Sequence, residues 1–89
     1  MARGPMLQNN QELYASVREL SRRLDDLASP ELASELRAAL SVSSLPGEVL
    51  GEIGLALGRL RGHRAYATPE VRRLVDEGAA YVKRALGSR

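Results

Sequence analysis

The single histidine and a few paired carboxylates are the residues of this chain best suited to chemistry. The sequence has one histidine, His63, and no cysteine, so thiolate nucleophiles, disulfides and cysteine-ligated metal sites are excluded. His63 has no serine, aspartate or cysteine partner at a recognisable spacing. Glu31 with Glu35 and Glu48 with Glu52 share helical faces, but such pairs are ordinary on solvated helices and no Glu-x-x-His element accompanies them. We therefore predict no catalytic residue, no metal and no cofactor, and we expect a protein that is not an enzyme.

A basic segment over residues 59–73 is a candidate for binding anions. It holds five arginines and one glutamate, a local net charge of +4 (5 − 1), within a chain whose net charge is +2. The candidate anion or nucleic-acid patch consists of Arg59, Arg61, Arg64 and Arg72. Arginines near a helix C-terminus also complement the helix dipole, and aromatic side chains for base stacking are nearly absent here. The segment thus offers an alternative function, a small regulator that binds nucleic acid or an anionic ligand, but nucleic acid is not the favoured partner.

A stripe of glycines at helical spacing is the most unusual feature of the sequence. The stripe comprises Gly47, Gly51, Gly54, Gly58 and Gly62, at spacings of 4, 3, 4 and 4 residues. Each glycine inside a helix costs about 0.5–1 kcal/mol relative to alanine. Small residues at this spacing let another helix approach closely. We expect that approach within the monomer or against a partner helix, with a hinge or ligand groove as further alternatives, and take Gly51, Gly54 and Gly58 as candidate interface residues.

The first helical segment carries a narrow apolar stripe that also suits an interface. Leucines and one valine recur at spacings of 4, 3, 4 and 3, in the order Leu13, Val17, Leu20, Leu24 and Leu27. This is the a/d pattern of a coiled coil. Such a stripe suits one neighbouring helix of the same chain or a second copy, and the sequence leaves both open. Leu13, Val17, Leu20 and Leu24 are therefore also candidate interface residues.

Punctuation residues divide the chain into four expected helices. The first begins with Asn9 as N-cap and Glu12 three residues later, a variant of the capping box. Proline follows a cap residue in both Ser29-Pro30-Glu31 and Thr68-Pro69-Glu70, which start the second and fourth helices. The third runs from about Pro46 to about Gly62, and Gly87 is a suitable residue to end the fourth.

These elements predict an all-α fold, a small antiparallel four-helix bundle made of two helical hairpins with a hinge at residues 41–47. We expect residues 1–8 to be a flexible N-terminal tail and residues 9–87 to form a single helical-bundle domain. Because the third helix has apolar and glycine faces and only a narrow polar back, we expect it to be the central helix.

Composition agrees with a small helical protein. The 89 residues include fifteen leucines and twelve alanines but no phenylalanine or tryptophan, a balance that favours helix over strand. No apolar run approaches the ~18 residues of a membrane span, and no secretory signal is evident. Twelve arginines against one lysine indicate a GC-rich bacterial genome. We expect a cytoplasmic protein that does not bind membranes, acting as a non-catalytic protein–protein interaction or self-association module, as a homodimer or with another protein.

Overall fold

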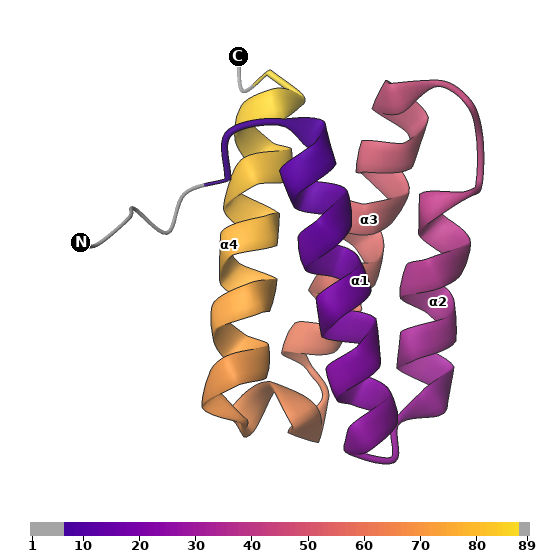
Figure 1. The fold of residues 1–89 in the computed structure, drawn as a ribbon. Coiled ribbons are helices and arrows are strands. Elements are labelled where there is room, and N and C mark those ends of the chain that lie inside the picture. The colour runs from indigo at the N-terminus through magenta and orange to yellow at the C-terminus, as the bar shows by residue number, and fades with distance from the viewer. Residues whose placement is uncertain (1–6, 88–89) are drawn as a thin grey trace.

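The computed structural model describes residues 7–87, and within this range the chain is helical without any strand. The elements are α1 (Asn10–Asp26), α2 (Pro30–Leu40), α3 (Pro46–Arg61), the short 3₁₀-helix η1 (Arg64–Ala67) and α4 (Pro69–Ala85). The four α-helices pack as an antiparallel bundle of two hairpins (Figure 1), which confirms the predicted fold class. The hinge predicted at residues 41–47 overlaps the connection between α2 and α3.

The helices stand at the four corners of the bundle. α1 packs against α2 and α4, and α3 packs against the same two helices, whereas the diagonal pairs make few or no close backbone approaches. The expectation that α3 is central is therefore wrong. The apolar side of α3 faces the core. On its glycine side, Gly54 lies close to Val82 of α4, whereas Gly47 and Gly58 are exposed.

The helix starts follow the predicted punctuation, with one difference in chemistry. The Asn9 side chain accepts a hydrogen bond from the backbone N–H of Glu12 at 2.9 Å, so the predicted N-cap is confirmed. The Glu12 carboxylate reaches past Asn9 and accepts from the N–H of Gln8 at 2.7 Å. Ser29 and Thr68 occupy the N-cap positions of α2 and α4, but neither side chain makes a capping hydrogen bond. At these two starts the proline at the first helical position is the effective signal, because its fixed φ suits the helix and it lacks an N–H that needs a partner.

The tight connection between α1 and α2 is a Schellman turn built without glycine. The Ser29 N–H donates to the Leu24 carbonyl at 2.8 Å, and the Ala28 N–H donates to the Asp25 carbonyl at 3.1 Å. Ala28 adopts φ +60°, the left-handed conformation that this turn requires. The turn reverses the chain within three residues and sets α2 beside α1. Gly87, the residue predicted to end α4, also has a positive φ, +78°.

The core is an aliphatic cluster to which all four helices contribute. Its fully buried large side chains are Leu13, Val17, Leu20, Leu24, Leu36, Ile53, Leu57, Leu60, Val71 and Val75. The inner face of α4 is buried as far as Val82, whereas Ala85 and Leu86, at the end of the helix, are exposed.

The two ends of the described chain lie together at one end of the bundle (Figure 1). Arg84 Nη2 donates to the Leu7 carbonyl at 3.0 Å, and the Tyr81 hydroxyl donates to Asn10 Oδ1 at 2.5 Å. Leu7 is half-buried against the core. Of the predicted flexible tail, residues 1–6 lie outside the described range, while Leu7 is held against the bundle.

Candidate protein-interaction surface

The glycine stripe of α3 is mostly open. A Cβ added at Gly47, Gly51 or Gly58 would meet no atom within 4 Å beyond its own surroundings in the helix. At Gly54 an added Cβ would lie 3.2 Å from Val82 Cγ1 of α4. The close approach expected from the stripe is therefore realised inside the monomer only at Gly54.

Gly78 of α4 supplies the closest glycine contact in the described part of the chain. A Cβ there would lie 3.0 Å from Leu57 Cδ1 and 3.6 Å from Leu13 Cδ1. Its neighbours are leucine side chains of α3 and α1, and not the glycines of the α3 stripe. The glycine gives the Leu57 side chain room to lie against the α4 backbone.

Leu55 lies in the middle of the open side of α3, and sequence reasoning missed it. Its 59% exposure is the highest among the large exposed hydrophobic residues. The other four lie at helix ends or in a connection, namely Leu27, Val42, Leu45 and Leu86. Its exposure could have been predicted from the sequence, because Leu55 lies outside the apolar stripe of α3 and between Gly51 and Gly58 on the glycine side. We call Gly47, Gly51, Gly54, Leu55 and Gly58 the α3 face.

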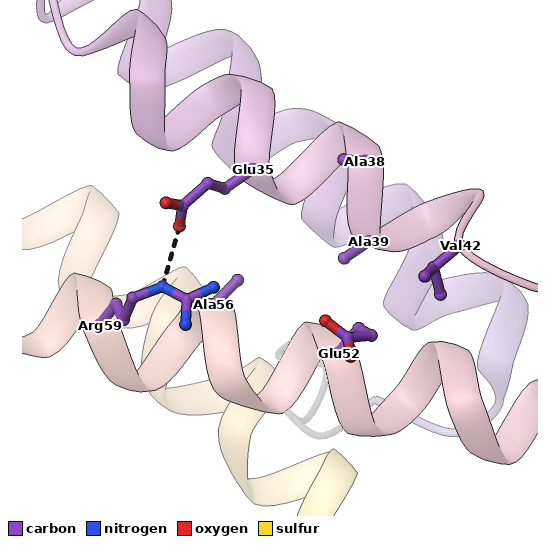
Figure 2. A pocket seen from close by; sticks show the side chains of 7 residues that line it. All are labelled: Glu35, Ala38, Ala39, Val42, Glu52, Ala56 and Arg59. Carbon is purple, nitrogen blue, oxygen red and sulfur yellow. Dashed lines mark hydrogen bonds and ion pairs between the residues drawn. The ribbon is translucent and has the colours of Figure 1, made fainter.

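Charged residues border the α3 face on the side of α2 (Figure 2). Here α2 and α3 enclose a groove of about 200 Å³, with alanine side chains on both walls. Arg59 Nε donates to Glu35 Oε1 at 3.0 Å across the groove. Glu52, nearer the α2–α3 connection, has no polar partner among the described residues. The border is therefore acidic in the first half of α3, where Glu48 also lies, and basic at Arg59.

The predicted apolar stripe of α1 is not part of any surface. Leu13, Val17, Leu20 and Leu24 are each at most 2% exposed and lie in the core of the single chain. Of the two alternatives left open by the sequence, an intramolecular neighbour is the one that the fold realises. We therefore leave these four residues out of the candidate surface.

The basic segment is partly neutralised within the fold. Arg59 pairs with Glu35, and Arg61 Nη2 lies 3.0 Å from Asp76 Oδ1. The guanidinium of Arg72 lies 5.5 Å from the centre of the Tyr66 ring. These contacts reduce the charge that Arg59 and Arg61 present to a ligand.

Arg64 is the remaining member of the predicted patch. Among the described residues it has no ion-pair or hydrogen-bond partner for its side chain. The four predicted arginines are thus not assembled around one site: two are paired, one lies beside an aromatic ring and one is free.

Asp76 is the acceptor at the end of the α3–α4 contact. Its Oδ1 accepts from the Tyr66 hydroxyl at 2.6 Å as well as from Arg61. The Tyr66 hydrogen bond first, and then Arg61, lower the pKa of Asp76 below its ordinary 3.8. The same hydrogen bond to Asp76 raises the pKa of Tyr66 above 10.0. This cluster tethers η1 to α4 and is explained by that structural role.

His63 also has a structural role. It is half-buried, and its Nδ1 accepts from the N–H of Ala65 at 3.0 Å, which caps η1. Within residues 7–87, no three histidine, cysteine or acidic side chains gather as a metal site would require.

A shallow hollow between α1 and α2 brings together arginines that the sequence did not connect. Arg18, Arg22 and Arg37 line it with Glu19. Arg22 pairs with Glu19, and Arg37 Nη1 lies 3.2 Å from Asp25 Oδ2, so both have acidic partners. The sequence alone does not predict this cluster, because the arginines come together only through the register in which α1 packs against α2.

Comparison with known proteins found no relative of this chain. No protein-family model, no curated protein and no solved structure matches the chain. None of the described helices is both long enough and apolar enough to cross a lipid bilayer.

Proposed function

We propose that this chain is a non-catalytic protein-interaction module that binds a partner through the α3 face. The observation that supports the proposal is that Leu55 is exposed between two glycines, and that no other part of the fold packs into the space above these glycines. Within the monomer, Gly51 and Gly58 leave open space where an alanine would fit.

The energetics of α3 support a role outside the monomer. Gly51, which is half-buried, and Gly58, which is exposed, together cost about 1–2 kcal/mol relative to alanine inside a helix. A leucine side chain that is 59% exposed withholds roughly 1 kcal/mol of the ~1.5–3 kcal/mol that full burial yields. Both costs fall on the same side of the same helix. A partner that covers Leu55 and approaches the bare backbone at the glycines would recover part of this free energy.

The arrangement also fits the physics of close helix packing. Small residues spaced three or four apart form a shallow depression along a helix, and a partner helix can lie there with its axis unusually close. Leu55 projects from the border of this depression. The α3 face thus offers both an apolar projection and a recess.

Site-specific photo-crosslinking in the cells that make the protein tests the proposal. We place a photo-reactive residue at position 55 and, as a matched control, at position 80, because Ala80 is exposed in the middle of α4. We expect a defined crosslinked protein from position 55 only. The product should disappear when Gly58→Glu is added, since a charged side chain then fills the recess.

Two results would contradict the proposed function. One is the absence of any protein product from position 55. The other is a product that forms equally from position 80 or survives Gly58→Glu. The crosslinked protein, whether another copy of this chain or a different protein, is identified by mass spectrometry of the product.

A further inference from the structure

We infer that the partner of the α3 face is a second copy of this chain, bound through an antiparallel pairing of α3 with α3 about a two-fold axis. The inference rests on the proposed function and adds the identity and direction of the partner. Three observations carry it: the shape of the face, a precedent inside the same molecule and the distribution of charge along α3.

The shape of the α3 face is self-complementary. A two-fold interface brings the same patch of both subunits together, so the patch must fit itself. Leu55 is a projection, and Gly58, three residues further along, is a recess with nothing within 4 Å of an added Cβ. When two α3 helices run antiparallel, Leu55 of each copy can lie over Gly58 of the other. A face made only of projections or only of recesses would not fit itself in this way.

The bundle interior already contains the same packing. Leu57 lies over Gly78, with its Cδ1 3.0 Å from where a Cβ of Gly78 would be. α3 and α4 are consecutive long helices of the antiparallel bundle. A leucine over a glycine between antiparallel helices is thus a contact that this chain uses once within the monomer, and the proposed dimer would use it twice more.

Charge along α3 selects the antiparallel direction. Glu52 has no described polar partner, and the only ion pair of Arg59 uses Nε, which leaves both terminal nitrogens of its guanidinium without a described partner. Both residues border the α3 face on the side of α2 (Figure 2). A two-fold axis keeps this border on the same side of both copies, so antiparallel pairing brings each Glu52 near Arg59 of the other copy. In parallel pairing the two-fold axis would put this border on opposite sides of the two copies, so Glu52 and Arg59 of different copies would lie apart and would not attract each other.

The pairing should be weak, because it is centred on one helix of each copy. Stable dimers usually bury about 800 Å² per partner, more than one helix face provides. We expect a dissociation constant in the micromolar range, on the order of 10–100 μM. Sedimentation of the full chain from about 10 μM to about 1 mM covers that range. The observed mass should rise from that of the monomer, 9.7 kDa, toward twice that value.

A single substitution tests the role of the face. Leu55→Glu should weaken dimerisation about tenfold or more, because it places a carboxylate over an apolar contact. Since Leu55 is exposed, the melting temperature of the monomer should change little. Ala80→Glu, on the solvent-facing side of α4, is the matched control and should leave both properties unchanged. A dimer that tolerates Leu55→Glu would overturn the inference.

A charge-swap cycle tests the direction. In antiparallel pairing, Glu52→Arg alone and Arg59→Glu alone each oppose like charges and should weaken dimerisation, whereas the double variant restores it. In parallel pairing the two borders lie on opposite sides of the dimer, so neither swap creates a new clash and no rescue occurs. Failure of the rescue overturns the antiparallel arrangement.

The sedimentation and crosslinking results separate this inference from the proposed function. A monomer throughout the concentration range overturns self-association. The proposed function would still stand if position 55 crosslinks to a different protein, and it would fall as well if position 55 yields no specific product.

Discussion

A leucine lies next to a glycine on both the inner and the outer side of α3, but the inner pair is buried and the outer pair is open to solvent. On the inner side, Leu57 is 1% exposed and lies against Gly78 of α4. On the outer side, Leu55 is 59% exposed and the neighbouring Gly58 has empty space above it. The difference shows that a helical glycine has no fixed meaning. At Gly78 the absent side chain is filled by a leucine of the same chain, whereas at Gly58 nothing in the described structure replaces it.

The largest expected effect comes from truncating the inner leucine. Leu57→Ala should lower the free energy of unfolding by about 2–5 kcal/mol, because it leaves a cavity against Gly78. Leu55→Ala, two residues away, should change the free energy of unfolding of the monomer by no more than about 0.5 kcal/mol. Urea denaturation of both variants at low protein concentration measures the contrast. Similar losses for both would mean that the outer side is part of the fold.

Filling the glycine positions tests the same contrast from the other direction. Gly78→Leu should destabilise the bundle by about 1–3 kcal/mol, because the added side chain overlaps Leu57 and Leu13. Gly58→Leu introduces the same side chain where the space is open and should not destabilise the monomer. Thermal unfolding followed by circular dichroism compares the two. A neutral Gly78→Leu would contradict close packing between α3 and α4.

Alanine at the open glycines should stabilise the monomer. Gly51→Ala and Gly58→Ala each add a methyl group without a clash, and each should raise the free energy of unfolding by about 0.5–1 kcal/mol through helix propensity. If the α3 face binds a second copy, the double variant should also dimerise less well. Denaturation and sedimentation of the same samples measure both properties. A loss of monomer stability would show that the glycines serve the fold itself.

The smallest effect concerns the polar cluster that closes the inner side of α3 against α4. The Tyr66 hydrogen bond and Arg61 lower the pKa of Asp76, so this carboxylate stabilises the fold above its unfolded pKa of about 3.8 and that contribution is lost as the pH falls through its folded value. Because the Asp76 side chain is still 45% exposed to solvent, we expect its contribution to be less than about 1 kcal/mol. Asp76→Asn should reduce the loss of stability between about pH 5 and pH 2.

Alkaline conditions sharpen the same test. Asp76 raises the pKa of Tyr66, so the protonated hydroxyl stabilises the fold below its unfolded pKa of about 10.0, and this contribution is lost as the pH rises through its folded value. Tyr66→Phe should remove the loss at high pH. Denaturation midpoints measured across the pH range follow both variants, and a Tyr66→Phe profile identical to that of the parent chain would contradict the role of the hydrogen bond.

The helices themselves were largely predictable, because their signals are local. Asn9 followed by Glu12, and proline at the first position of α2, α3 and α4, are read from a few neighbouring residues. The positions of the helices around the core were only partly predictable. The expectation of a central α3 was wrong because the glycine face was counted with the apolar face as buried surface. The sequence of α3 does not show whether a glycine faces the core or the solvent.

The candidate surface was predictable in its glycines and not in its neighbours. Whether Gly54 or Gly58 is covered depends on the position of α4, which the sequence of α3 does not contain. Leu55 was missed because it does not lie on the same helical face as the buried leucines of α3, which form the main apolar pattern of this segment. The turn at Ala28 was also not predictable. Ala28 adopts a left-handed conformation, which sequence patterns associate with glycine or asparagine and not with alanine.

The meeting of the two described chain ends at one end of the bundle has a mechanical consequence. Arg84 binds the Leu7 carbonyl, and Tyr81 binds Asn10, so the start of α1 and the end of α4 lie side by side. A force that pulls on both ends would act across the helix axes and open the α1–α4 contact from that end, one turn at a time. This is an unzipping geometry, which resists tension far less than two helices sheared along their length. Under load the bundle would part first between α1 and α4, while the hairpin of α2 and α3 stays closed longer.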